Sequence, residues 1–488
     1  MKNWNPKRES RRELKARPHP AWCILAFVCG CQSYAPSPLD PAAHQVAWQA
    51  RDLNDGSLTE FLNQRRSPLP GPGWEFDLSD GLNLHEARLV AIAFNPDLRL
   101  ARLRAGMAAA SAEHAGRWMD PEFSFSALGA TDDIPDPWVV GPSISFAVPI
   151  LGRAGAESEH AQAQTRAAAT TVLGAEWRVW GAVWAAWQDW SAALLRVQAT
   201  EALRESLYDL IQRVNALAEA GELPRTEANL FHLEYQGQAV ELLRLESLAR
   251  TKRQALWALM GLTPQAELSP APYLSPLREG RTADDFFPIT TRTAFTEALR
   301  HSNLELAELW DKYEISEKAL DLEIARQVSD LSLGPAFESD AGQPRLGIVA
   351  GISLPLFHAN RQGIATARAA RLLTRAQYET TLEVICGRWA GIQDKVESLH
   401  RIKQQIELLL MPMAQQQLEQ ALQLMQLGEG SSLVLLESLV RAHQTKLDWI
   451  DNTLAVSAAE GEITQMRGPQ THEDSAPESS ATESGDNQ

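Results

Sequence analysis

The sequence has few cysteines. Only four occur in 488 residues, and Cys23, Cys29 and Cys31 all lie in or directly after an N-terminal leader. Cys386 alone remains in the rest of the chain, so no disulfide framework can form within one mature chain. It stands in an apolar helical run, where a lone cysteine acts as a small packed side chain.

Positive charge is also scarce. The formal net charge is −17, and removal of residues 1–30, which carry seven Lys/Arg and two Asp/Glu, changes it to −22. Proteins that bind nucleic acid neutralise phosphates with Lys and Arg. The composition therefore argues against nucleic acid as a partner.

No catalytic or metal-binding motif can be recognised. The eleven histidines show no metal-ligand spacing such as His-x-x-x-His. Gly71 and Gly73 stand in a proline-rich segment rather than between a strand and a helix, which argues against a phosphate-binding loop. No nucleophile, base and orienting residue occur in one local motif. The sequence predicts no enzyme, no metal site and no cofactor.

The N-terminus carries the features of a secretory leader. A basic stretch precedes an apolar run at residues 21–28, which is too short to span a bilayer as a helix. The run ends in Val28-Cys29-Gly30-Cys31, which resembles the lipobox of bacterial lipoproteins. The resemblance implies a lipoprotein signal peptide at residues 1–30 and a lipid anchor at Cys31. An ordinary signal peptide or a buried N-terminal helix stays open as an alternative.

Two copies of one unit make up most of the remaining chain. The sequence NPDL at 95–98 recurs loosely as NLEL at 303–306, displaced by 208 residues. VPIL at 148–151 is answered by LPLF 206 residues later, and AGE at 220–222 by LGE 207 residues later. Three landmarks at nearly one displacement indicate a duplication.

The duplication divides the chain into two repeats and three connecting segments. Residues 31–81 are rich in proline and are expected to be mostly extended, with a short helix around residues 58–64. Repeat 1 covers 82–262, a proline-rich linker covers 263–290, and repeat 2 covers 291–466. The acidic residues 467–488 are expected to be a disordered tail.

Each repeat contains two segments in which apolar and small residues alternate. We expect strands at about 122–129 and 142–149 in repeat 1, and at about 330–338 and 345–355 in repeat 2. Segments of this length span a bilayer when tilted. The sequence therefore predicts two membrane hairpins, and a hairpin packed on a soluble core stays open as an alternative.

The two faces of these strands differ in chemistry. Small residues suit the crowded inside of a barrel, whereas large apolar residues suit lipid. We therefore predict that four large apolar side chains face lipid. They are Ile144, Phe146, Ile348 and Ile352.

Helical sequence surrounds the strands. One helix is expected from about 83 to 118, and a pair of long helices follows each hairpin. Each pair reverses at a glycine that can adopt a left-handed conformation, after which Ser or Thr can cap the returning helix. The predicted tip residues are Gly221, Glu222, Arg225, Thr226, Gly428, Glu429, Ser431 and Ser432.

With these parts in place, the chain resembles the TolC-like outer membrane efflux proteins over about residues 45–466. The run GISLPLF leading to NRQG is similar to the sequence that closes the second hairpin in the heavy-metal-efflux and lipoprotein branches of that family. The matching segments are LNLHEA at 82–87, NPDL at 95–98, ISFAVP at 144–149, GISLPLF at 351–357 and NRQG at 360–363.

The resemblance implies a mainly α-helical fold with a membrane β part. Duplicated long-helix hairpins would form a periplasmic tunnel, and each chain of a homotrimer would contribute four strands to one β-barrel. The function implied is that of an outer-membrane channel, a passive exit duct for drugs, metal ions or other small molecules in a tripartite efflux pump. Its partners would be outer membrane lipid, an inner-membrane transporter of the RND type, and a periplasmic adaptor that meets the helical tips.

Two other classes of protein remain open at this stage. A periplasmic adaptor would also be helical and lipidated, but should show one helical hairpin and Gly-rich lipoyl halves. A coiled-coil scaffold lipoprotein of an envelope complex would explain the helices and leave the alternating segments unexplained. The duplicated strand hairpin is the feature that separates a channel from both.

Replacement of the predicted anchor tests lipidation. Cys31→Ser should abolish labelling by a tagged fatty acid, because no thiol remains to receive the lipid. Membrane association should be largely retained, since strands embedded in the bilayer make one acyl signal redundant. Mass spectrometry that finds an unmodified N-terminus at another residue contradicts the prediction.

Overall fold

A computed structural model of the chain describes most of both repeats. The described residues are 34–51, 53, 56, 58, 60–61, 76, 81–129, 131, 138–150, 152–268, 270–274, 297, 299–340 and 343–469. The predicted signal peptide, Cys31, most of the linker and nearly all of the acidic tail lie outside them. The chain divides into two compact units, Met1–Arg51 and Asp52–Gln488, and each is described by itself.

The first unit contains one described helix, α2 (Pro41–Gln49). Asp40 caps it, because the carboxylate accepts a hydrogen bond from the Ala43 amide at 3.0 Å, and Pro41 at the first helical position has a φ angle suited to a helix. The expectation of an extended segment over residues 31–81 is therefore wrong at this point. A capped helix start lies within the proline-rich sequence.

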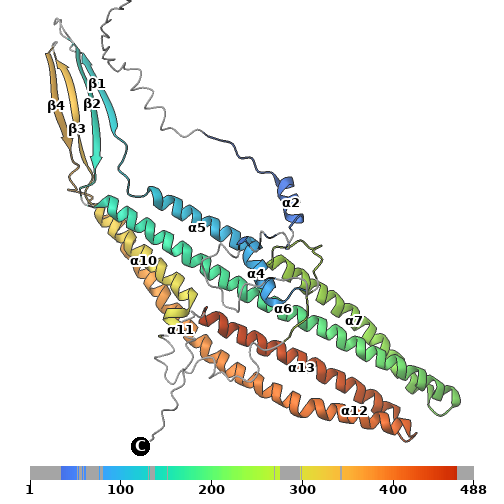
Figure 1. Cartoon of the computed structure of the whole chain (residues 1–488). Coiled ribbons are helices and arrows are strands. Elements are labelled where there is room, and N and C mark those ends of the chain that lie inside the picture. The colour runs from blue at the N-terminus through green and yellow to red at the C-terminus, as the bar shows by residue number, and fades with distance from the viewer. Residues whose placement is uncertain are drawn as a thin grey trace, which may run out of the picture. The chain divides into compact units, whose positions relative to one another are not determined.

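The second unit is built from long helices and one sheet (Figure 1). The longest helix, α6, has 68 residues, which corresponds to a length of about 100 Å. Among the described residues, no helix combines the length and apolar composition needed to cross a membrane. The helices are α4 (Leu84–Phe94), α5 (Pro96–His114), α6 (Arg153–Ala220), α7 (Arg225–Leu259), α10 (Leu304–Ala325), α11 (Arg361–Gln405), the π-helical turn η1 (Ile406–Leu410), α12 (Met411–Gln426) and α13 (Ser432–Arg467).

The expectation of one helix over residues 83–118 is wrong. Asn83 starts α4 through a capping box, in which its backbone and side chain exchange hydrogen bonds with Glu86. Asn95 then leaves the helical conformation and its side chain accepts from the Asp97 and Leu98 amides. Because Pro96 lacks an N–H and disfavours a helical residue before it, the chain stops α4 and starts α5 at this point.

The duplication is visible in two equivalent asparagines. Asn95 caps α5 and its amide nitrogen donates to the Leu259 carbonyl, at the end of α7, at 2.8 Å. Asn303 caps α10 by accepting from the Leu306 amide, and donates to the Met466 carbonyl, at the end of α13, at 2.6 Å. In each repeat one buried asparagine therefore joins the start of the helix before the hairpin, α5 or α10, to the end of the last helix, α7 or α13.

The four strands form one antiparallel sheet in chain order. The strands are β1 (Glu122–Gly129), β2 (Trp138–Val148), β3 (Leu331–Asp340) and β4 (Gln343–Gly351). The ladder between β2 and β3 joins the hairpin of repeat 1 to that of repeat 2. Within the described part of the chain, β1 and β4 each keep one edge unpaired.

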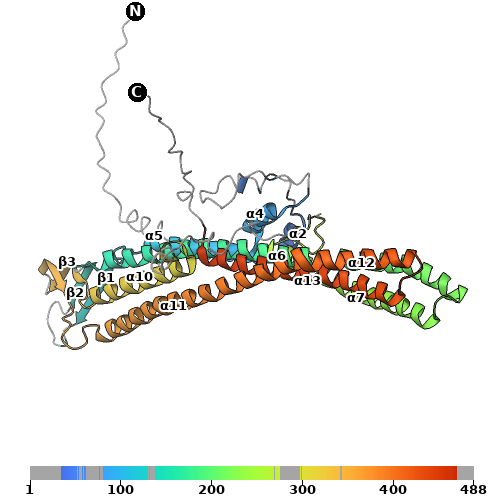
Figure 2. The ribbon, with the colours of Figure 1, turned by 90° about the horizontal axis from the view of Figure 1, so that it is seen from below.

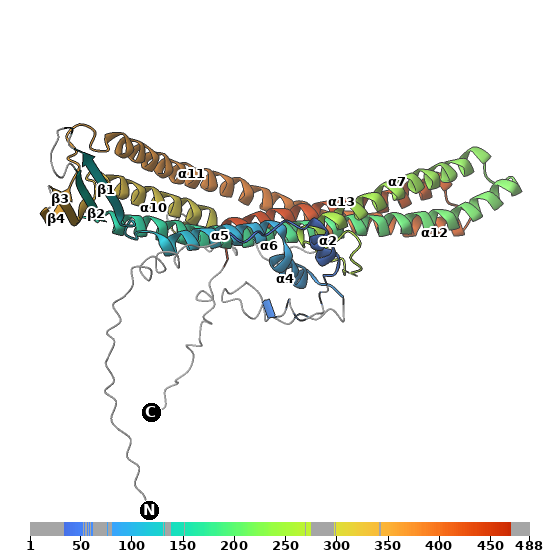
Figure 3. The same ribbon diagram turned by 90° about the horizontal axis from the view of Figure 1, so that it is seen from above.

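Helix α6 runs along most of the second unit. It packs against α4 and α5 and against α7, and it also contacts α10 and α13 of the other repeat. Figures 2 and 3 show the strands beside one end of these helices and the α6–α7 and α12–α13 turns at the other. Ion pairs reinforce the contact between repeats, with Arg178 to Glu308 at 2.8 Å and Lys318 to Glu159 at 2.6 Å.

Tryptophans of α6 form the largest apolar core with α4 and the end of α7. Trp187 and Trp257 are fully buried in this region. The guanidinium of Arg88 lies over the Trp180 ring, 4.4 Å from its centroid, which is a cation–π contact. Burial lowers the pKa of Arg88 to about 9. The tryptophan stripe is thus a packing surface that holds the first short helices against α6.

Loss of the closing asparagine should destabilise a repeat. Asn303→Ala removes the cap of α10 and leaves the Met466 carbonyl without its donor, so we expect a loss of about 1–3 kcal/mol. Thermal unfolding in detergent, followed by circular dichroism, measures the change. Asn215→Ala is the control, because Asn215 contacts His232 at the surface and should change stability by less than about 0.5 kcal/mol. Equal melting temperatures for the two variants would refute this role of Asn303.

Candidate functional site

The register of the sheet sorts its side chains onto two faces. Phe146 of β2 lies opposite Leu333 of β3, and residues directly opposite one another share a face. Side chains alternate along each strand, and each ladder keeps one register, so every strand residue can be assigned. One face, called the apolar face here, has Ser339 as its single polar residue. Its members are Phe123, Phe125, Ala127, Gly129, Trp138, Val140, Pro142, Ile144, Phe146, Val148, Leu331, Leu333, Pro335, Phe337, Ser339, Pro344, Leu346, Ile348 and Ala350.

The opposite face, called the small-residue face here, is dominated by Ser, Gly and Ala. Ser124 and Ser143 form a hydrogen bond between their hydroxyls at 2.7 Å. At Gly334 a Cβ would lie 1.7 Å from the Ile144 carbonyl oxygen, so this position requires glycine. The members of this face are Glu122, Ser124, Ser126, Leu128, Val139, Gly141, Ser143, Ser145, Ala147, Ser332, Gly334, Ala336, Glu338, Asp340, Gln343, Arg345, Gly347, Val349 and Gly351.

Three of the four residues predicted to face lipid lie together on the apolar face. Ile144, Phe146 and Ile348 are all exposed there, Ile348 by 78%. The strand expected over about 345–355 ends at Gly351, so Ile352 lies one residue beyond β4 and its lipid contact stays a prediction. In the register of this ladder Ile352 would lie opposite Leu331, the first residue of β3, but the pairing ends one residue earlier, at Ser332 and Gly351.

The backbone beyond the ladder is bonded differently. The Ser353 amide donates to the Ser329 hydroxyl at 3.1 Å, and that hydroxyl donates to the Ser353 carbonyl at 3.3 Å. The Ser329 side chain therefore makes the two hydrogen bonds with Ser353 that the backbone of a partner strand would otherwise make. The sequence pattern extended through 355 because apolar and small residues go on alternating after the strand has ended.

Two joints connect the sheet to the long helices. Gly152 and Asn360 precede α6 and α11, and both adopt the left-handed conformation, with φ of 72° and 49°. Asn360 is held there because its amide donates to the Glu323 backbone carbonyl at 2.8 Å and to the Glu323 carboxylate at 2.7 Å. At Gly363 a Cβ would lie 2.3 Å from that carboxylate. The NRQG sequence therefore fixes the start of α11 against the end of α10.

The first joint uses an ion pair. Arg153, the first residue of α6, donates to Asp330, directly before β3, at 3.0 Å and to Glu157 at 2.8 Å. The hydrogen bond with Asp330 raises the pKa of Arg153. Sequence reasoning missed Asp330 and Glu323, because each lies far along the chain from the residue that it holds and no local motif marks it.

The helical tips are ordered turns that begin at the predicted glycines. Gly221 and Gly428 have φ of 78° and 76°, where a side chain would be strained. Behind each glycine the next amide bonds back to the helix, Glu222 to the Leu217 carbonyl at 2.9 Å and Glu429 to the Leu424 carbonyl at 3.1 Å. These are Schellman turns. The exposed predicted residues are Gly221, Glu222, Arg225, Thr226, Gly428, Glu429 and Ser431.

The expected side-chain hydrogen bonds of Ser/Thr caps are absent at both tips, although a serine does occupy the cap position of α13. Pro224 occupies the cap position of α7, and Ser431 occupies that of α13 without a side-chain hydrogen bond. Ser432 is buried, and its hydroxyl donates instead to Glu227 of the other tip. Ser432 was predicted to be an exposed contact residue, and that prediction is wrong. Its side chain instead joins the two tips.

An apolar cluster joins the two tips into one packed unit. It combines side chains of α6, α7, α12 and α13, with Phe231 fully buried at its centre. Val214 and Leu435 contribute from α6 and α13. Because this core is shared, the two turns are held at a fixed spacing, which a partner that binds both turns would need.

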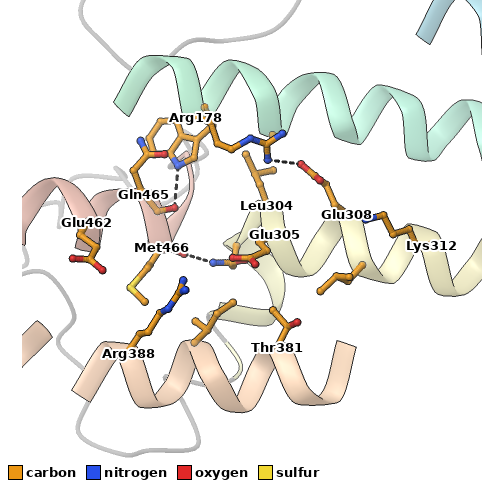
Figure 4. A pocket seen from close by; sticks show the side chains of 15 residues that line it. Arg178, Leu304, Glu305, Glu308, Lys312, Thr381, Arg388, Glu462, Gln465 and Met466 are labelled. Atoms are coloured by element: carbon orange, nitrogen blue, oxygen red, sulfur yellow. Dashed lines mark hydrogen bonds and ion pairs between the residues drawn. The ribbon is translucent and has the colours of Figure 1, made fainter. Parts of the chain in front are cut away.

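A pocket of about 560 Å³ lies between α6, α10, α11 and α13 (Figure 4). Arg178 and Glu308 pair across its wall at 2.8 Å, and exposed side chains of both charges stand around it, Lys312 and Arg388 against Glu305. The lining residues include no histidine, serine or cysteine. Within the described residues no three His, Cys, Asp or Glu side chains are grouped to hold a metal. The pocket belongs to the contact between repeats, and its geometry assigns no chemistry.

Comparison with known proteins identifies the fold. No protein-family model and no curated protein matches the sequence. The structure matches CusC with a TM-score of 0.66 at 16% identity, covering 83% of this chain and 96% of that one. It matches the outer membrane protein VceC of Vibrio cholerae with a TM-score of 0.63 at 17% sequence identity, covering 79% of this chain and 96% of VceC. It matches the outer membrane channel CmeC of Campylobacter jejuni with a TM-score of 0.65 at 15% sequence identity, covering 82% of this chain and 90% of CmeC.

These likenesses extend over both repeats. Each covers about four-fifths of the chain, which is more than either repeat alone contains. The expected fold class is confirmed. The chain has the fold of the TolC-like outer membrane channels.

Proposed function

We propose that this chain is the outer-membrane channel subunit of a tripartite efflux pump. One observation carries the proposal: a four-stranded sheet with an exposed apolar face, a face of small residues, and two open edges. The fold shared with outer membrane channels supports the same reading. The proposed role is passive conduction, so it requires no catalytic residue and no cofactor.

The apolar face has the properties of a lipid contact. Phe123 and Ile348 are exposed by 66% and 78%, and in water such a continuous apolar surface would be covered by a partner. Strands of 8 to 11 residues reach about 26–36 Å at 3.3 Å per residue. Strands β2, β3 and β4, with 11, 10 and 9 residues, have the length of tilted membrane strands, and β1 is one residue shorter. We place this face against the outer membrane lipid.

The open edges determine how the chain assembles. In lipid, the unpaired amides and carbonyls of β1 and β4 have no water to bond, so the sheet must close. Pairing β1 of one chain with β4 of the next forms a ring of identical contacts. A homotrimer closes such a ring with twelve strands, since each chain supplies four. The small-residue face then lines the pore.

The helices extend the duct on the periplasmic side. In the trimer the long helices form a tunnel, and the packed tips form its entrance. There they meet a periplasmic adaptor and, through it, an inner-membrane transporter of the RND type. Drugs, metal ions or other small molecules would pass through the duct, and Cys31 would add a lipid anchor to the barrel. A periplasmic adaptor or a scaffold lipoprotein fits less well, because neither needs an amphipathic sheet in each chain.

The polarity of the sheet gives the first test of this function. The wild-type protein in a planar bilayer should form pores. Ile348→Arg puts a charge into lipid and should cost about 2–4 kcal/mol of assembly free energy if the residue is near the midplane. Ser145→Arg should assemble and reduce single-channel conductance, because it narrows the lumen. Normal assembly of Ile348→Arg with blocked assembly of Ser145→Arg means that the faces are inverted.

The tips give the second test. Arg225 is exposed at the start of α7, so Arg225→Glu should leave trimer stability unchanged while weakening adaptor crosslinking and efflux. Arg368→Glu makes the same charge change on an exposed position of α11 near the sheet, and should leave both unchanged. If Arg225→Glu and Ser431→Trp both crosslink and transport normally, the tips are simple turns.

A further inference from the structure

The charged residues of the sheet are all on one face. The four strands contain Glu122, Glu338, Asp340 and Arg345 as their charged residues, and the register puts all of them on the small-residue face. Three of them gather at the turn between β3 and β4. Glu338 lies directly opposite Arg345, and the Arg345 guanidinium pairs with the Asp340 carboxylate at 3.3 Å.

This cluster lies at the end of the sheet away from the helices. Strand β3 begins at Leu331, after α10, and β4 ends at Gly351, before α11, so the β3–β4 turn is the distal end (Figure 1). At the opposite end, where the strands join the helices, Glu122 is the one charged residue that the described strands contain. The side chains of Arg345 and Asp340 are 60% and 40% exposed. Their charges are therefore open to solvent and can attract or repel ions in the solution, in addition to pairing with each other.

We propose that Glu338, Asp340 and Arg345 form a charged belt that sets the ion selectivity of the pore at its outer mouth. This inference rests on the proposed function, because the small-residue face must line a lumen. Within the described strands each chain contributes two carboxylates and one guanidinium to this belt, a net charge of −1, and three chains repeat that charge around the ring. Rings of charged side chains select ions by sign. The wild-type pore should therefore prefer cations, and Arg345 limits that preference.

An alternative role is purely structural, since opposite charges on neighbouring strands stabilise a hairpin. The two roles respond differently to restored charge. Arg345→Gln changes the belt from −1 to −2 per chain and removes the ion pair. Adding Glu338→Gln returns the charge to −1 without restoring the pair. If the belt sets selectivity, the double variant should behave like wild type, because its net charge is the same. If the role is structural, the double variant should behave like Arg345→Gln, because both lack the ion pair.

The test measures the reversal potential of single pores in a KCl gradient. Wild-type protein, Arg345→Gln, the double variant Arg345→Gln/Glu338→Gln and the charge-retaining Arg345→Lys are compared at low ionic strength. Arg345→Gln should shift the potential towards that of K⁺, and the double variant and Arg345→Lys should return close to wild type. The shift should shrink in about 1 M salt, where the Debye length falls to about 3 Å.

The outcomes separate this inference from the proposed function. Wild-type protein that forms no pore overturns both. Pores whose reversal potential is the same in wild type and Arg345→Gln overturn the charged belt and leave the channel in place. A shift that the double variant fails to reverse also overturns it, because the effect would then come from the lost pair. If Arg345→Gln fails to assemble, Glu338→Gln alone should shift the potential towards that of Cl⁻, and no shift rejects the belt.

Discussion

The ladder between β2 and β3 is the interaction on which the rest of this structure depends. It is the hydrogen-bonded contact that joins the hairpin of one repeat to that of the other. Because side chains alternate along a strand, a slip of one residue would move the apolar residues of a whole hairpin to the opposite face. The observed register, with Phe146 opposite Leu333 and Val148 opposite Leu331, joins two half-faces into one continuous apolar surface.

Two joints beside the sheet fix where α6 and α11 begin. Arg153 pairs with Asp330, directly before β3, and Asn360 is held by Glu323 of α10, so each joint ties one repeat's helix to a neighbouring element. From these joints α6 runs past α10 and α13 to the tips. At the other end the buried contact of Ser432 with Glu227 joins the two turns again. The repeats are thus connected at both ends, and a movement of one tip has to displace the other.

Much of the fold could be predicted from local patterns. The displacement of about 207 residues between landmarks marked the duplication, and the change from helical to alternating periodicity marked the strands. Gly221 and Gly428 stood at the reversals, since the left-handed conformation favours glycine. Predictions failed where a distant residue decided the outcome. Strand β4 ends at Gly351, beyond which the Ser353 amide donates to the Ser329 hydroxyl, and Ser432 is buried with its hydroxyl donating to Glu227.

The sequence alone therefore determined which segments are helix or strand, which strand residues are apolar, and where the chain turns. These depend on the order of residues within a few turns or one strand. Only the tertiary structure decided that all four strands share one register, that Glu338 and Arg345 meet on the face opposite Ile348, and that Asn303 closes its repeat on Met466. Such pairings join residues far apart in the chain, and their free energy comes from geometry that no local pattern contains.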